Sequence, residues 1–160
     1  MYRRRVEFAD TDTANLIHFT ALMRFMEEAE HAFYRSLDFH GYRWSEASVF
    51  GMPRVSVSCD YLGAVRYGDV VEVRLQVREV RTKAIRYAAE FTIDGSEGRE
   101  IVARSDWTVV CARRDHGSRD WRGVEIPARL RRQLEVASRA TRWRGLRRRE
   151  RSRRGGRGRR

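Results

Sequence analysis

The hydrophobic residues of this chain change their spacing from a helical period to a strand period. Between residues 20 and 37, apolar side chains recur every three or four positions, which predicts a long helix with one buried face. Between residues 55 and 111, apolar and polar residues alternate in four segments with turn signals such as Asp94-Gly95. One long helix can cover so much sheet only from the concave side of a strongly curved antiparallel sheet. The sequence therefore predicts an α+β fold, a long central helix wrapped by a curved antiparallel β-sheet.

The segments around these elements are shorter and less periodic. Residues 2–9 alternate and predict a strand, and residues 10–17 predict the loop that leads into the helix, with Thr20 as the helix N-cap. Residues 38–53 predict a connecting loop with at most one short turn of helix. A second helix is predicted over residues 128–137, directly after a proline that suits a first helical turn.

Most of the positive charge lies at the C-terminus. Residues 139–160 hold twelve arginines and one glutamate, so they carry +11 of the net charge of +12. We therefore divide the chain into a folded domain, residues 1–138, and an Arg-rich tail, residues 139–160, whose composition predicts disorder. We expect nonspecific contact of this tail with polyanions, such as nucleic acid or an anionic membrane surface, as a consequence of its charge.

Several functional classes have no support in the sequence. No run of about 18 apolar residues predicts a membrane span, and the basic N-terminus leads into a strand pattern instead of the apolar core of a signal peptide. We expect a cytoplasmic protein. No GxSxG, P-loop or zinc-ligand spacing occurs, so we expect neither a bound metal nor a cofactor.

Two aspartates, Asp10 and Asp12, precede the long helix. A carboxylate beside a helix N-terminus suits chemistry on a carbonyl group, because the first backbone N–H groups have no intrahelical acceptor and lie at the positive end of the helix dipole. The sequence also allows a purely structural reading, in which both carboxylates accept hydrogen bonds from loop N–H groups. For Asp10 we favour this structural role.

The order of elements and the local motifs resemble those of the hot-dog fold, in particular the 4-hydroxybenzoyl-CoA thioesterase family. The motifs are Phe8-Ala-Asp-Thr-Asp12, Leu16-Ile-His-Phe19, Met26-Glu-Glu-Ala29 and Tyr67-Gly-Asp69, and the resemblance covers residues 2–112. It implies an acyl-CoA thioesterase that uses water to cleave an acyl-CoA thioester into a carboxylate and CoA, with CoA as part of the substrate. It also implies a homodimer or homotetramer with the active site between protomers.

The resemblance assigns catalytic roles to two residues, Asp12 and Phe19. Asp12 would attack the thioester carbonyl or activate a water for that attack, and the backbone N–H of Phe19 would polarise the thioester oxygen. Such N–H donors typically contribute about 2.7–4 kcal/mol each to a developing oxyanion. For His18 two roles are open: a packed or hydrogen-bonded residue at the helix start, or an acid or base in the same pocket, since the ordinary pKa of histidine lies near neutrality.

The chain departs from the family pattern in the loop itself. Asn15 stands where the family usually has glycine, and Asn enters the left-handed region readily, so we expect the loop shape to persist. The resemblance places Asn15, Ile17 and Glu27 against the substrate. The alternative to an enzyme is a noncatalytic hot-dog module that binds acyl groups or proteins and uses the Arg-rich tail to contact a polyanion.

Overall fold

The computed structural model describes residues 1–96 and 98–140 of the chain. Its helices are a short 3-10 helix η1 (Phe8–Asp10), the long α1 (Phe19–Ser36) and α2 (Ala128–Ala140). Its strands are β1 (Tyr2–Arg5), β2 (Tyr42–Trp44), β3 (Ser48–Gly51), β4 (Arg54–Tyr61), β5 (Val70–Val80), β6 (Ala84–Gly95), β7 (Gly98–Val110), β8 (Ala112–Asp115) and β9 (Arg122–Gly123). Of the predicted Arg-rich tail, residues 141–160 lie outside the described part of the chain.

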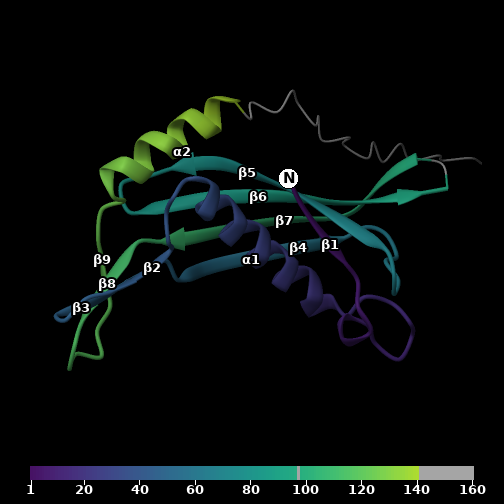
Figure 1. The fold of residues 1–160 in the computed structure, drawn as a ribbon, viewed down its shortest axis with the longest axis horizontal. Coiled ribbons are helices and arrows are strands. Elements are labelled where there is room, and N and C mark those ends of the chain that lie inside the picture. The colour runs from purple at the N-terminus through teal and green to yellow at the C-terminus, as the bar shows by residue number, and fades with distance from the viewer. Residues whose placement is uncertain (97, 141–160) are drawn as a thin grey trace, which may run out of the picture.

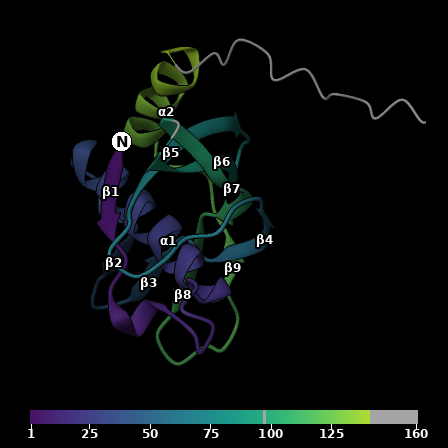
Figure 2. The same cartoon turned by 90° about the vertical axis from the view of Figure 1, so that its right-hand side faces the viewer.

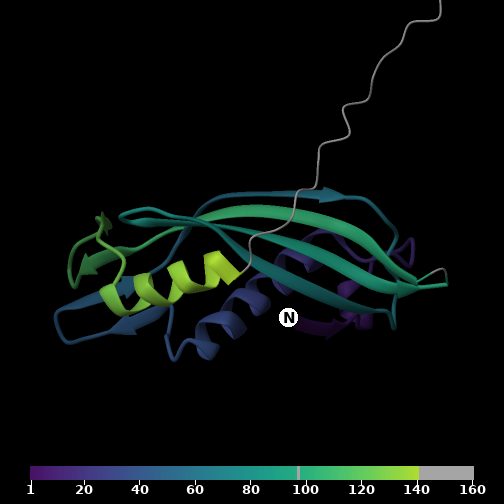
Figure 3. The ribbon, with the colours of Figure 1, turned by 90° about the horizontal axis from the view of Figure 1, so that it is seen from above.

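The main sheet has five antiparallel strands in the order β1-β5-β6-β7-β4. Both α1 and α2 lie on one side of this sheet, and α1 crosses it diagonally (Figures 1 and 3). Figure 2 shows β4 on the far side of the sheet from β1, so β4 forms one edge. The predicted hot-dog architecture, a long helix wrapped by a curved antiparallel sheet, is confirmed.

The core lies between α1 and the concave face of the sheet. The helix buries the face that its periodicity predicts, including Leu22, Phe25 and Met26, against Phe91 and Trp107 from the sheet. Truncating a side chain of this kind to alanine costs about 2–5 kcal/mol because it leaves a cavity. The apolar periodicity of α1 is therefore the main determinant of how the helix sits on the sheet.

A second, smaller sheet corrects the prediction for residues 38–53. Instead of a loop with a helical turn, this segment forms the hairpin β2–β3, and the small sheet has the order β2-β3-β8-β9. Its strands are two to four residues long, which is too short for an alternating pattern to be recognised in the sequence. Strand β3 needs β8, which lies about sixty residues later in the chain, to complete its hydrogen bonds.

The predicted boundaries are wrong in three places. The first strand ends at Arg5 rather than at residue 9, because residues 8–10 turn into η1 and the Thr11 N–H donates to the Phe8 carbonyl at 3.1 Å. The N-cap of α1 is His18, not Thr20. The helix α2 continues to Ala140, three residues beyond its predicted end.

Candidate active site

The loop between β1 and α1 is held in place by Asp10. Its side chain is 4% exposed and accepts hydrogen bonds from the Glu7 N–H at 3.0 Å and from Arg24 at 2.7 Å. Burial alone would raise the pKa of Asp10, but these two hydrogen bonds and the charges of Arg4 and Arg24 together hold it below its ordinary value. The structural role predicted for Asp10 agrees with these contacts.

Asp12 lies at the start of a tight, exposed loop. Its Oδ1 accepts hydrogen bonds from the N–H groups of Ala14, at 2.8 Å, and Leu16, at 3.3 Å. Within residues 1–96 and 98–140, no side chain or backbone group donates to its Oδ2. One oxygen therefore fixes the orientation of the carboxylate, and the other remains available for chemistry.

Residues 11–17 form a closed loop whose ends meet. Thr11 and Ile17 make an isolated antiparallel bridge, and the Asp12 N–H donates to the Leu16 carbonyl at 2.8 Å. Asn15 at the tip has a φ of 58°, the left-handed conformation predicted for it. Ile17 is half-buried, and its N–H donates to the Val65 carbonyl at 2.8 Å. The loop thus carries Asp12 and the start of α1 on one short, hydrogen-bonded segment.

His18 begins the helix and is committed to capping it. Its ring Nδ1 lies 2.7 Å from the Thr20 hydroxyl and accepts a hydrogen bond from the Thr20 backbone N–H at 3.3 Å. The backbone N–H of His18 donates to the Asp10 carbonyl at 2.7 Å. The Nδ1 atom therefore acts as an acceptor for the Thr20 N–H, which leaves Nε2 as the ring nitrogen free of these contacts. A histidine cap is not among the preferred N-cap residues, so the sequence pattern favoured the neighbouring threonine.

Phe19 is the first residue of α1, and its N–H points to no intrahelical acceptor. No hydrogen bond joins this N–H to any residue in the described part of the chain. The Phe19 carbonyl accepts a hydrogen bond from the Tyr61 hydroxyl at 2.9 Å, which ties the helix start to the end of the edge strand β4. Sequence reasoning missed Tyr61, because only the strand pairing brings it beside the helix.

Glu27 lies on α1, two turns beyond the loop residues. Its carboxylate is half-exposed and forms an ion pair with Arg54 at 3.0 Å. The next residue, Glu28, accepts a hydrogen bond from the Tyr2 hydroxyl at 2.8 Å and pairs with Arg4 at 3.4 Å. Of these two carboxylates, neither contacts the residues of the 11–19 loop through a hydrogen bond or ion pair.

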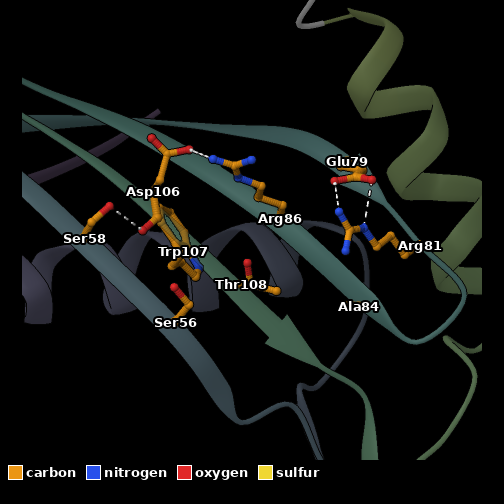
Figure 4. A pocket seen from close by; sticks show the side chains of 9 residues that line it. All are labelled: Ser56, Ser58, Glu79, Arg81, Ala84, Arg86, Asp106, Trp107 and Thr108. Atoms are coloured by element: carbon orange, nitrogen blue, oxygen red, sulfur yellow. Dashed lines mark hydrogen bonds and ion pairs between the residues drawn. The ribbon is translucent and has the colours of Figure 1, made fainter.

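The outer face of the main sheet holds a shallow cavity of about 210 Å³ that includes none of the predicted site residues. Figure 4 shows its charged side chains paired with one another, Arg86 with Asp106 and Arg81 with Glu79, and the Ser58 hydroxyl beside Asp106. In residues 1–96 and 98–140, no cluster of His, Cys, Asp and Glu is arranged to hold a metal ion. None of the helices in the same residues is long and apolar enough to cross a membrane.

The sequence matches a family model and is similar to several named proteins. The model of the thioesterase-like superfamily matches residues 6–134. The chain is 35% identical over 82 residues to a putative esterase of Aquifex aeolicus, an alignment that spans 50% of this chain and 62% of that protein. It is 28% identical over 130 residues to the 4-hydroxybenzoyl-CoA thioesterase of Pseudomonas sp. strain CBS-3, covering 79% of this chain and 90% of that enzyme.

Solved structures share the fold. The structure of the Pseudomonas 4-hydroxybenzoyl-CoA thioesterase superposes with a TM-score of 0.69 at 21% identity, covering 83% of this chain and 96% of that one. A gentisyl-coenzyme A thioesterase superposes with a TM-score of 0.67 at 23% identity, covering 84% and 99%. At this level of identity the superpositions establish the fold, and the family model, which matches residues 6–134, establishes the family.

Proposed function

This chain belongs to the thioesterase-like superfamily, and from that membership we propose that it is an acyl-CoA thioesterase with its catalytic site at the 11–19 loop. One observation carries the proposal. Residues 11–19 carry both a carboxylate with one uncommitted oxygen, on Asp12 in the closed loop, and a helix-terminal N–H without an acceptor, on Phe19 at the start of α1. Relatives named as thioesterases or hydrolases of CoA thioesters support the choice of substrate class.

The proposed chemistry divides between these two groups. The Asp12 carboxylate either attacks the thioester carbon and forms an acyl-aspartyl anhydride, or takes a proton from a water that attacks instead. In both routes the carbonyl oxygen gains negative charge, and the Phe19 N–H at the positive end of α1 stabilises that charge. The CoA thiolate then leaves, and in the first route water hydrolyses the anhydride.

The first test replaces Asp12 by asparagine. The amide oxygen of Asp12→Asn can still accept the N–H groups of Ala14 and Leu16, so the loop is retained while the nucleophile or base is lost. We expect acyl-CoA turnover, followed with a thiol reagent across a panel of acyl chains, to fall by several powers of ten. Asp60→Asn, an exposed aspartate on β4, is the charge-matched control and should retain activity.

Two outcomes would change the assignment. Undiminished turnover by Asp12→Asn would remove this carboxylate from the mechanism. If the unaltered protein releases no CoA from any member of the panel, the noncatalytic binding module becomes the better description of the chain.

We also propose that two copies of the chain pair along β4. This strand is a sheet edge, and its residues Val55, Val57 and Tyr61 are 61%, 46% and 46% exposed. Val57 stands opposite Trp107, whose indole faces α1, so Val57 and Tyr61, four residues later on the same strand, lie on the helix side of the sheet. An edge strand has backbone N–H and C=O groups without partners, and a strand of another chain can pair with them. A second β4 would cover this edge and bring another protomer close to the Tyr61–Phe19 contact.

Pairing along β4 predicts that a substitution on this strand changes the molecular mass of the assembly and leaves the fold of each chain unchanged. Val57→Lys places a charge on the helix side of β4 and should shift the protein toward the monomer in sedimentation equilibrium. Ser56→Lys, on the outer face of the same strand, is the matched control and should leave the oligomer intact. A monomeric unaltered protein would contradict the pairing.

A further inference from the structure

A larger cavity, of about 450 Å³, lies at the far end of α1 from the Asp12 loop. It opens to solvent and is lined by the segment that follows α1, the start of α2 and the small sheet, with Phe39, Leu130 and Phe50 among its apolar lining. No residue of the 11–19 loop lines it. Its volume falls in the range of about 300–1,000 Å³ that is usual for small-molecule sites.

Two arginines of the small sheet flank one wall of this cavity. Arg43 on β2 and Arg113 on β8 stand on either side of Phe50 on β3, because each is its direct cross-strand neighbour. Cross-strand neighbours project on the same face of a sheet, and all three residues line the cavity. Within the described ranges, neither guanidinium takes part in an ion pair or hydrogen bond. Both are therefore available for a carboxylate or phosphate, which arginine binds through two parallel hydrogen bonds.

The start of α2 adds to the positive potential. Pro127, Arg129 and Leu130 line the cavity, and the first hydrogen bond of the helix joins the Arg131 N–H to the Pro127 carbonyl at 2.9 Å. The earlier N–H groups of this turn have no intrahelical acceptor, and they lie at the positive end of the helix dipole. An anion in the cavity would thus meet two unpaired guanidinium groups and a helix N-terminus.

The acidic residues of the lining do not cancel this charge. Asp38 pairs with Arg129 at 2.8 Å, and Glu125 lies on the exposed rim. Gln133 also lines the cavity, and its Nε2 donates to the Leu37 carbonyl at 3.1 Å. Its Oε1 is buried and has no hydrogen-bond donor among residues 1–96 and 98–140.

From these contacts we propose that the cavity is a second binding site, for a small organic anion whose carboxylate or phosphate sits between Arg43 and Arg113 and whose apolar body packs on Phe50, Phe39 and Leu130. The site is separate from the thioester chemistry at Asp12. Because it rests on its own residues, it stands whether or not the chain hydrolyses acyl-CoA.

Calorimetric titration of the full chain tests the proposal with three probes that share one aromatic body: benzoate, phenyl phosphate and the neutral benzyl alcohol. We expect one benzoate or one phenyl phosphate to bind per chain, and benzyl alcohol to bind at least about tenfold more weakly, since it lacks the charge. The preferred anion identifies the head group. Failure of both anions to saturate a site, or equal binding of benzyl alcohol, overturns the proposal.

Variants locate the site. Arg43→Gln, Arg113→Gln and the double variant should weaken anion binding, the double variant by about tenfold or more. Arg5→Gln is the matched control, because Arg5 is an exposed arginine of β1 that lies outside the cavity lining. An equal loss of anion binding in Arg5→Gln would indicate general charge attraction instead of a site. Asp12→Asn should bind normally; loss of binding there would place the anion at the catalytic loop. A loss of binding counts only where the variant is folded, so the urea unfolding midpoint of all four arginine variants should equal that of the unaltered protein. We expect this result because the substituted arginines are exposed.

Discussion

The buried carboxylate of Glu30 makes a sharp prediction about stability. Glu30 lies on the buried face of α1 and is 3% exposed. Its Oε2 accepts hydrogen bonds from the Trp107 indole at 2.6 Å and from Arg54, at the start of β4, at 2.8 Å. Burial alone would lower the pKa of Arg54, but Glu30 and Glu27 raise it above its ordinary value. The arginine is therefore the charge that allows Glu30 to remain in the core.

Replacing Arg54 by methionine removes this charge and keeps most of the aliphatic volume. Leaving one member of a buried ion pair without its partner costs about 3–5 kcal/mol. Because the Arg54 side chain is 25% exposed and water reaches it, we expect the lower value of about 3 kcal/mol. With a urea dependence of about 2 kcal/mol per molar, the unfolding midpoint should fall by about 1.5 M.

Urea unfolding at one fixed protein concentration measures this loss. Arg86→Met is the control, because the Arg86–Asp106 pair is about half-exposed and should contribute less than about 1 kcal/mol. Combining Arg54→Met with Glu30→Gln removes the stranded charge while keeping an acceptor for Trp107, so more than half of the lost stability should return. The reasoning is refuted if Arg54→Met costs no more than Arg86→Met, or if the double variant recovers nothing.

Two further predictions concern the loop before α1. Asn15→Ala forces a residue without an amide into the left-handed conformation at φ 58° and should cost about 1–2 kcal/mol in urea unfolding, whereas Asn15→Gly should cost less; equal costs would contradict the conformational argument. The pKa of Asp10 is lower in the folded chain than its unfolded value of about 3.9, so its carboxylate stabilises the fold above that pH and loses this contribution as the pH falls through the lowered pKa. The urea midpoint should therefore drop less between about pH 5 and about pH 3 in Asp10→Asn than in the unaltered protein, and an equal drop would contradict this assignment.

The candidate site was predictable where local chemistry decides it. Asn15 takes the left-handed conformation because its short amide side chain tolerates that region wherever it occurs. Asp12 accepts N–H groups two and four residues later, which is an interaction within one loop. The Tyr61–Phe19 and Arg54–Glu30 contacts join residues 24 or more positions apart, so no local pattern points to them.

The sequence by itself determined the long helix, the four long strands and the curved sheet that they require. Their periods of 3.6 and 2 extend over many residues, and only one side of the sheet can be covered by a single helix. The tertiary structure decided the small sheet and the anion cavity behind it. Strands of two to four residues carry no readable period, and they become strands only when β8 and β9 return beside β3. The pairing of β8 with β3 places Arg43 and Arg113 on one face of the small sheet. The register of two strands depends on both segments, whereas the periodicity of one segment can be read from that segment alone.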